Sequence, residues 1–259
     1  MKYKLCFVLI LTFAANGCDL FSVKSLPVSK PNSDKTEDVQ NISKDYNKPQ
    51  IIARIKDDAI TESSGIVISR INKNVFWTHN DSGDDSFLYA FDSNGDKRGV
   101  FKIPNAENVD WEDIAIFHDS NKISYLFVGD IGDNNAKRDE ITVYQIREPK
   151  IETSDAKTTK KNPRLTDNAI AIKIKYPDEQ FDAESLLINP QNGDLYVVTK
   201  MYVGAAHIYK LSPPFAQNKT NVLQNIGEIK VANTPEGLFT GGEISPDGKR
   251  LVLCDYLQA

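Results

Sequence analysis

The chain has 259 residues, of which 40% are hydrophobic and 26% are charged, a balance typical of a globular protein. Its net charge of −5 argues against a nucleic-acid partner, because such a partner requires a basic surface. Of the three cysteines only Cys254 lies outside the N-terminal segment described next, so a disulfide framework is excluded. We expect Cys254 to be a small core residue on a strand.

Residues 1–17 have the pattern of an export signal. Lys2 and Lys4 precede the apolar run Leu5–Ala15, which is too short to span a bilayer. The run leads into Ala15-Asn16-Gly17-Cys18, which resembles a bacterial lipobox. We therefore expect Cys18 to carry a lipid that anchors the protein to the membrane, the alternative being an ordinary cleaved signal with an incidental cysteine. The expected location is the exported side of the bacterial cell envelope, and Asp19 resembles an inner-membrane retention signal of Gram-negative lipoproteins.

Residues 18–49 are rich in Ser, Lys, Asp, Asn and Pro and contain few aromatic residues. Such a composition buries too little apolar surface to offset the entropy lost on ordering, so this segment is predicted to be a disordered tether. Residues 50–259 then remain for one domain, and their length is ordinary for an all-β barrel or propeller.

Within this domain the pattern predicts strand after strand and no sustained helix. Turn-forming residues such as Asp92–Gly95, Asn189–Gly193 and Ser245–Gly248 separate the strands. The polar, lysine-rich segment 150–167 is predicted to be an excursion at the edge of the sheet structure. The expected strands are 63–69, 74–79, 86–92, 97–103, 112–118, 123–129, 140–147, 168–176, 184–189, 194–199, 206–211, 222–231, 243–246 and 250–255.

An acidic residue opens an apolar run at Glu62, Glu112, Glu184 and Glu243, and a second strand-like run follows each time. A repeat of this length is typical of propeller blades, so the sequence predicts an all-β propeller with four visible blade repeats. The last repeat stops after two strands. Either the early run Ile51–Ile55 completes that blade or the chain is a truncated form of a longer propeller, and we favour truncation.

The innermost strand of a blade lines the central channel, so the four glutamates are expected to share one level at its mouth. Asp110 and Asp182 each precede a glutamate by two residues and therefore point the same way. Carboxylates gathered closely repel unless a cation sits among them, and oxygen ligands favour Ca²⁺. Structural capping of loops by the same acids and a ligand site without a metal are the alternatives. Zinc is disfavoured, because His79, His118 and His207 share no ligand spacing.

The loops His79–Gly83 and Gly129–Asn134 supply the further candidate metal ligands Asp81, Asp130 and Asp133. Such turns either wrap a cation or are held by their own Asx hydrogen bonds. Arg138 and Lys200 are the basic residues beside these loops. They would suit an anionic substrate if they faced a metal, and otherwise they pair with nearby acids.

The motifs ESSGIVIS, FWTHNDSGD, NVDWEDIAI, FVGDIGDNNAKRDEITVYQIREP and EISPDGKRLVL resemble a family of exported bacterial β-propeller proteins, most of which lack an assigned activity. That family is similar to phytase-esterase-like propellers and, more loosely, to calcium-dependent lactonases and phytases. The resemblance covers about residues 55–256 and implies further blades beyond the SPDG strand. Where the family tends to have Arg-Thr-Tyr, this chain has Cys254-Asp255-Tyr256.

Two functions remain open from the sequence. The first is a calcium-dependent hydrolase of a phosphate, lactone or carboxyl ester, in which Glu112 or Glu184 acts as general base and Arg138 and Lys200 assist. The second is a non-catalytic propeller that binds a glycan, a peptide or a partner protein of the envelope. Trp77 and Trp111 are expected to be core residues in either case.

Overall fold

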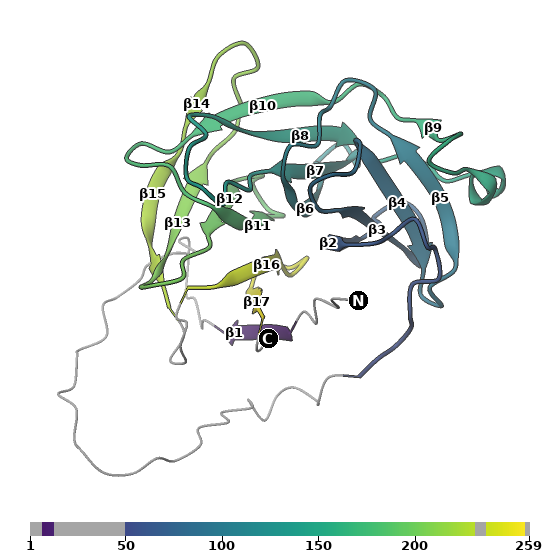
Figure 1. Ribbon diagram of the computed structural model, residues 1–259, viewed down its shortest axis with the longest axis horizontal. Coiled ribbons are helices and arrows are strands. Elements are labelled where there is room, and N and C mark those ends of the chain that lie inside the picture. Colours follow the sequence, from purple (N-terminus) through teal and green to yellow (C-terminus); the bar gives the residue numbers. More distant parts are fainter. Residues whose placement is uncertain (1–6, 13–49, 231–236, 257–259) are drawn as a thin grey trace, which may run out of the picture.

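The computed structural model describes residues 7–12, 50–230 and 237–256, and these form an all-β fold of four sheets (Figure 1). Cys18 and the predicted tether lie outside the described residues. Of the predicted export signal, only the backbone of Phe7–Thr12 is placed, as strand β1. No helix in the described part of the chain is long and apolar enough to cross a membrane.

Each of the four sheets is built mainly from strands that are consecutive in the chain. The first sheet has the order β2-β3-β4-β5-β9, the second β14-β10-β8-β7-β6, the third β11-β12-β13-β15 and the fourth β1-β17-β16. Neighbouring strands are antiparallel except for the parallel pairs β5–β9 and β10–β14. The bounds of the first sheet are β2 Ser63–Ile68, β3 Val75–Asn80, β4 Phe87–Asp92, β5 Lys97–Lys102 and β9 Arg164–Leu165. Those of the second are β6 Trp111–His118, β7 Ser124–Asp130, β8 Ile141–Arg147, β10 Ile170–Lys175 and β14 Asn221–Val222. The remaining strands are β11 Ala183–Ile188, β12 Leu195–Thr199, β13 Ala206–Leu211, β15 Gln224–Ile229, β16 Phe239–Ile244 and β17 Arg250–Asp255.

One edge strand of each sheet, β2, β6, β11 or β16, lies nearest the centre, and the sheets fan outward from these strands (Figure 1). β6 packs against β2 and β11, and β11 packs against β16. Side chains of one strand alternate between the two faces of its sheet, so a single strand serves two cores. On β6, Ile114 and Ile116 belong to the core between the first and second sheets, whereas Ala115 belongs to the core between the second and third.

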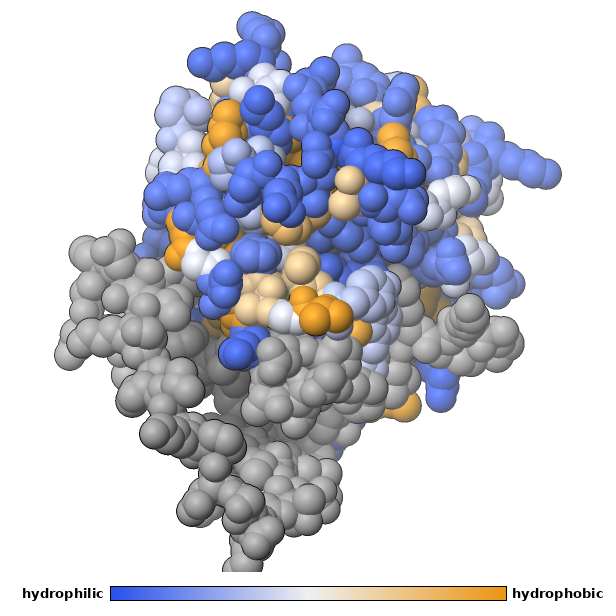
Figure 2. Space-filling view, turned by 60° about the vertical axis from the view of Figure 1, so that its left-hand side comes forward, coloured by the Kyte–Doolittle hydropathy of each residue, from blue (hydrophilic) through white to orange (hydrophobic). Residues whose placement is uncertain are grey.

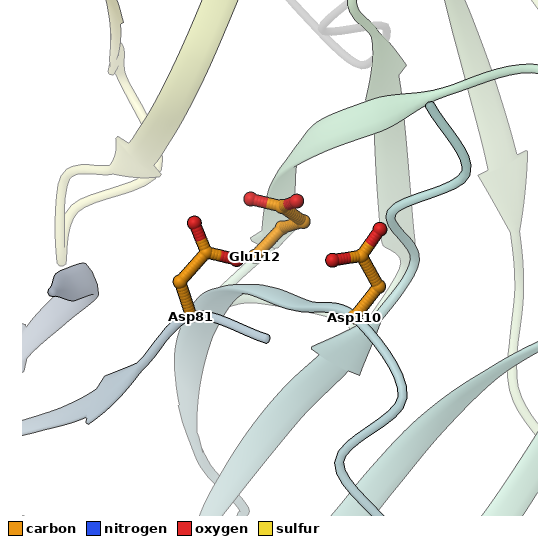
Figure 3. Close-up of side chains that lie close together, drawn as sticks. All are labelled: Asp81, Asp110 and Glu112. Atoms are coloured by element: carbon orange, nitrogen blue, oxygen red, sulfur yellow. The ribbon is translucent and has the colours of Figure 1, made fainter. Parts of the chain in front are cut away.

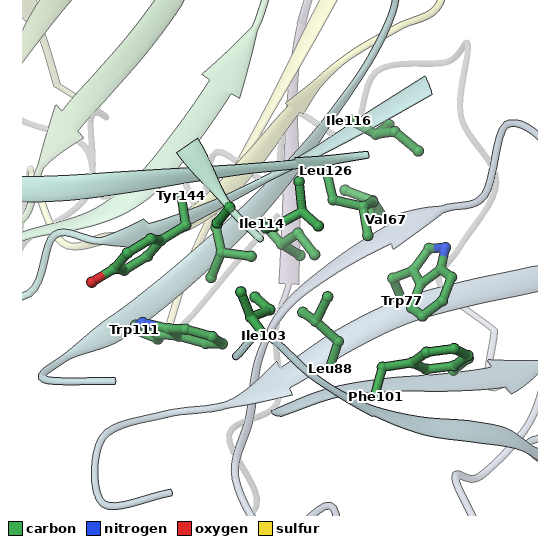
Figure 4. Packing of buried hydrophobic residues seen from close by; sticks show 14 of the residues in the cluster. Val67, Trp77, Leu88, Phe101, Ile103, Trp111, Ile114, Ile116, Leu126 and Tyr144 are labelled. Atoms are coloured by element: carbon green, nitrogen blue, oxygen red, sulfur yellow. The ribbon is translucent and has the colours of Figure 1, made fainter. Parts of the chain in front are cut away.

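The largest core side chains are the two tryptophans, which confirms their predicted role. Trp77 and Trp111 have no exposed surface and both belong to the core between the first and second sheets, shown in Figure 4. Each indole N–H has a partner, because Trp77 donates to Glu148 Oε1 at 2.9 Å and Trp111 donates to the Glu107 carbonyl at 2.9 Å. Cys254 is buried on β17, also as expected.

The fan is open on one side. A hydrophobic core lies between the third and fourth sheets, but among the described residues no hydrophobic cluster joins the fourth sheet to the first. On β2 the alternation buries Val67, while Ile66 and Ile68 are 53% and 46% exposed. The described strands therefore do not close into a ring.

Most strand predictions are confirmed, and the difference at β16 has an identifiable cause. β16 begins at Phe239 rather than at residue 243, because pairing with β17 holds Gly241 and Gly242 in the ladder despite their poor strand propensity. Ile51–Ile55 forms no strand, and the backbone that follows it is tied to the first sheet, where the Lys56 N–H donates to the Gly95 carbonyl at 3.0 Å. The strand beside β17 is instead β1.

The insertion after β8 is a packed element rather than a loose excursion. It contains the short 3₁₀ helix η1, Thr153–Lys157, and then β9, which pairs in parallel with β5 of the first sheet. Arg164 of β9 donates to Asp155 Oδ2 at 2.6 Å and so ties the strand to the helix. A segment that leaves the second sheet thus covers the outer edge of the first, which shields that edge from further pairing.

The buried carboxylate of Asp113 joins three sheets at the centre. Its Oδ1 accepts the N–H of Ile114 on β6 at 2.8 Å. Its Oδ2 accepts the N–H of Leu186 on β11 at 2.9 Å and that of Gly242 on β16 at 3.3 Å. On the remaining side lies Gly65 of β2, where an added Cβ would stand 2.7 Å from Oδ1. Burial raises the pKa of the Asp113 carboxyl well above its ordinary value, and its three N–H donors compensate part of the loss of water.

We expect Asp113→Ala to lower the free energy of unfolding by on the order of 3 kcal/mol, because it leaves buried N–H groups of three strands without an acceptor. Asp113→Asn keeps one carbonyl oxygen and should lose less. Urea denaturation followed by circular dichroism measures both, with the exposed Asp167→Ala as control. Equal stability of Asp113→Ala and the control would show that Asp113 does not hold the sheets together.

Candidate metal centre

Each of the four inner strands carries an irregularity of register close to its start. The shift lies between Ser63 and Ile66 on β2, Trp111 and Asp113 on β6, Ala183 and Ser185 on β11, and Phe239 and Gly241 on β16. Such a bulge adds one residue to one strand and turns its side chain out of the regular alternation. The residues in the last three bulges are Glu112, Glu184 and Thr240, and Ser64 with Gly65 fills that of β2.

Three carboxylates meet beside the bulge of β6. Asp81 follows β3, Asp110 precedes β6, and Glu112 occupies the bulge itself. One oxygen from each lies within 4.8 Å of the others, and Figure 3 shows the three side chains pointing toward one another. Glu112 is buried, whereas Asp81 and Asp110 are partly exposed, so the group opens to solvent on one side. Burial, together with the Asp81 and Asp182 carboxylates, raises the pKa of Asp110 above its ordinary value.

The loop after β7 closes over this group. The Gly132 N–H donates to the Asp110 carbonyl at 3.1 Å, and the Asp110 N–H donates to Asp130 Oδ1 at 3.0 Å. An added Cβ on Gly132 would stand 2.4 Å from Asp110 Oδ2 and 2.7 Å from Glu112 Oε1. Only glycine therefore leaves these two carboxylates in place. Gly132 is therefore needed for the close approach of the backbone to the two carboxylates.

The predicted ligands Asp130 and Asp133 already have other partners. Arg138 donates to Asp130 Oδ1 at 2.9 Å and to the Gly132 carbonyl at 2.8 Å. Asp133 Oδ2 accepts the N–H groups of Lys137 and Arg138, both at 2.6 Å, so its carboxylate holds the turn. These two acids order the loop beside the three-carboxylate group rather than join it.

Glu184 lies in the corresponding bulge of β11 but is bound to a cation of the protein itself. Its carboxylate accepts a hydrogen bond from the Lys200 ammonium, and both side chains are 4% exposed. Asp182 Oδ2 lies 3.9 Å from the same ammonium and has no hydrogen-bond partner, and Asp182 Oδ1 accepts the Asp133 N–H at 2.8 Å. Hydrogen bonding and the charge of Glu184 raise the Lys200 pKa, although burial opposes them. Both basic residues singled out in the sequence therefore pair with acids.

The expectation that four glutamates share one level is wrong for Glu62 and Glu243. Glu62 is exposed and precedes β2, two positions before Ser64, which donates to Glu112 Oε2 at 3.5 Å. Glu243 follows Gly242, whose N–H reaches Asp113, and therefore lies deeper along the strand than Glu112. The bulges set this register, and the acidic pattern in the sequence does not mark them. The structure thus brings Asp81, Asp110 and Glu112 together and places Glu62, Glu184 and Glu243 elsewhere.

Glu148, directly after β8 of the second sheet, is an acid with a structural role that lies outside the repeating acidic pattern of the sequence. Its buried carboxylate accepts hydrogen bonds from Ser69, from the Arg70 N–H at 3.3 Å, from Asn72 at 3.3 Å and from Trp77 at 2.9 Å. It therefore holds the β2–β3 turn against the second sheet. Its signal in the sequence was slight, namely an acid directly before Pro149 at the end of a strand.

Ser63, at the start of β2, is paired with a residue of β3. Its hydroxyl lies 2.6 Å from the Thr78 hydroxyl. His79 is fully buried, its Nδ1 lies 2.9 Å from the Asn80 carbonyl, and burial lowers its pKa. The side chains that come together at the start of β6 therefore offer carboxylate oxygens rather than a serine–histidine pair. No protein-family model matches the chain, and no curated protein sequence matches it.

Burial raises the pKa of Glu243 to about 7, with the Arg70 charge opposing it. Between pH ~4.5 and 7 the folded protein keeps a proton that the unfolded chain has released, so the free energy of unfolding should fall as pH rises, by at most ~1.4 kcal/mol per pH unit from this group. Glu243→Gln should flatten that slope. Urea denaturation at several pH values between 5 and 7 measures it. An unchanged slope, equal to that of the exposed-site control Glu62→Gln, would contradict the assignment.

Proposed function

We propose that the chain binds a divalent cation, Ca²⁺, between Asp81, Asp110 and Glu112. The convergence of these three carboxylates within 4.8 Å carries the proposal. Like charges at such separations raise each other's pKa unless a cation lies among them, and the raised pKa of Asp110 fits that condition. The donors are all oxygens, which favours Ca²⁺ over Zn²⁺.

We further propose that the four sheets are blades of a β-propeller and that the cation lies at the mouth of its channel. Each sheet places one edge strand at the centre, and each of these strands carries a bulge near its start. Repetition of one irregular feature in every sheet supports a common repeating unit. The N-terminal signal and Cys18 support a lipid-anchored protein on the exported side of the bacterial envelope.

The proposed reaction is hydrolysis of a small ester at this mouth. Bound Ca²⁺ would polarise an ester oxygen and lower the pKa of a water molecule. Glu184 is held by Lys200. Asp110 is partly exposed, so one oxygen of its carboxylate would contribute to the cation site and the other would accept the proton of the attacking water, while Glu112 serves as ligand only. This revises the assignment of the base to Glu112 or Glu184.

The charge of the mouth favours a carboxyl ester or lactone over a phosphate ester. Arg138 and Lys200 are bound to Asp130 and Glu184, so neither offers an unpaired cation to an anionic substrate. Asp81, Asp110, Glu112 and Asp182 would retain negative charge even after one Ca²⁺ binds. A multiply charged phosphate ester would therefore be repelled.

We expect Ca²⁺ to raise the melting temperature of the protein, because a ligand that binds only the folded state stabilises it by about 2.7 kcal/mol at a hundredfold excess over its dissociation constant. Glu112→Gln and Asp81→Asn should each abolish the saturable rise. Differential scanning calorimetry with EDTA and with a Ca²⁺ series measures it. Glu62→Gln removes an exposed acid outside the group and should respond like the parent chain. A flat response of the folded parent would overturn the metal site.

Gly132→Ala should weaken Ca²⁺ binding at least tenfold, because the new methyl group would displace the Asp110 and Glu112 carboxylates. Isothermal titration calorimetry gives the dissociation constant. The exposed Asn134→Ala lies in the same loop and serves as the control. Equal affinities of the two variants would place the cation away from the surface that Gly132 faces.

Turnover is tested separately from binding with 4-nitrophenyl acetate, a lactone and 4-nitrophenyl phosphate. The proposal expects Ca²⁺-dependent cleavage of the first two, lost in Asp110→Asn. If Ca²⁺ binds but none of the three is cleaved, the cation is structural and the protein is a binding module rather than a hydrolase.

A further inference from the structure

A groove of about 340 Å³ lies at the opposite end of β6 from the carboxylate group. Phe117 lines it near the end of β6, whereas Glu112 stands near the start of that strand. Since a strand rises ~3.3 Å per residue, more than ~15 Å of β6 separates the two. The groove is therefore a separate feature that the proposed ester hydrolysis does not use.

The floor of the groove is one face of the second sheet. The strand register places Phe127 of β7 opposite Gln145 of β8, and Gln145 opposite Ile170 of β10, so these side chains form a row across three strands. Phe117 and Tyr125 are paired across β6 and β7 two positions further along. Side chains two positions apart share a face, so all five line the floor.

The opposite wall comes from the third sheet. The loop after β13 contributes Pro213, Pro214 and Phe215, and the Phe215 ring meets the Phe127 ring edge-on with centroids 6.4 Å apart. The turn before β12 approaches at Gly193, where an added Cβ would stand 3.3 Å from the Phe117 ring. Aromatic rings from two sheets thus face one groove. On the side of the molecule shown in Figure 2, hydrophobic residues surface in patches among hydrophilic ones.

The polar groups of the groove are almost all neutral. Asp119 is the only charged residue among the described lining residues, and its Oδ1 is already bound to the N–H groups of Asn121 and Ile123. The side-chain amides of Gln145 and Gln217 and the Tyr125 hydroxyl make no hydrogen bond to another described residue. An amide and a phenol both donate and accept hydrogen bonds, whereas no lysine, arginine or histidine lines the groove to hold an anion.

We propose that this groove binds a neutral oligosaccharide. A sugar ring offers an apolar face of C–H groups, which suits the rings of Phe117, Tyr125 and Phe215, and hydroxyl groups, which both donate and accept and so match Gln145 and Gln217. The near absence of charge in the lining fits an uncharged ligand and disfavours phosphate-bearing ones. A proline-rich peptide also docks on aromatic side chains, but it lacks the many hydroxyl groups that the unpaired amides would satisfy.

The test is saturation-transfer difference NMR on the purified full chain with chitohexaose, cellohexaose and maltohexaose as probes. We expect signals from the ring C–H protons of at least one of these oligosaccharides. Phe215→Ala and Gln145→Ala should each weaken its binding about tenfold or more, since each removes either a stacking surface or a hydrogen-bonding amide. Tyr202→Ala removes an exposed aromatic residue outside the groove and should bind as the parent does.

Circular dichroism and urea denaturation establish that each variant is folded, and Gln217→Ala on the exposed loop gives a second variant whose folding is least at risk. Binding that survives both Phe215→Ala and Gln217→Ala would overturn the site. Absence of binding by all three oligosaccharides would overturn the ligand class, and binding of a proline decapeptide in the same groove would assign it to peptides. None of these results depends on Ca²⁺, so failure here is distinguishable from failure of the metal site.

Discussion

The central constraint of this fold is the burial of one carboxylate among the backbones of four strands. Asp113 accepts N–H groups from β6, β11 and β16, and Gly65 of β2 lies against its remaining side. A buried acid without such partners would be strongly unfavourable, so these strands are held at the positions where their N–H groups reach it. The cores between consecutive sheets then bury apolar surface at a spacing that this contact sets. The hydrogen bonds of Asp113 fix how the inner strands are oriented, and most of the stabilising burial of apolar surface comes from the hydrophobic cores around them.

Asp113 lies between two different sites, one at each end of β6. At one end, directly before Asp113, the bulge turns Glu112 toward Asp81 and Asp110. At the other end, the floor of the aromatic groove begins with Phe117. A partly exposed group of carboxylates and a nearly neutral groove thus share β6 without sharing side chains. The proposed cation would act on electrostatics at one end, while the groove depends on shape and neutral hydrogen bonds at the other.

The sequence predicted the strands well, because alternation and turn residues are local signals. It also predicted that Trp77, Trp111 and Cys254 are buried. The register of the inner strands could not be predicted from the sequence, because a bulge changes which residues face the centre without changing the apolar pattern. For this reason the predicted positions of Glu62 and Glu243 were wrong. Asp113 appeared as one more acid in the WEDIAI motif, and only the packing of three sheets distinguishes its role from that of Glu112. The groove combines side chains from two sheets, which no single segment of sequence indicates.

The same backbone bulge recurs near the start of all four inner strands, but the residue that occupies it differs. Glu112, Glu184 and Thr240 occupy three such positions, and Ser64 occupies the fourth with Gly65. Since the bulged residue leaves the regular alternation, its side chain lies outside the apolar rows that form the two neighbouring cores. One backbone feature therefore carries an acid on two of the inner strands and a hydroxyl on the other two. The backbone irregularity is common to the four sheets, and the chemical group that it presents differs from sheet to sheet.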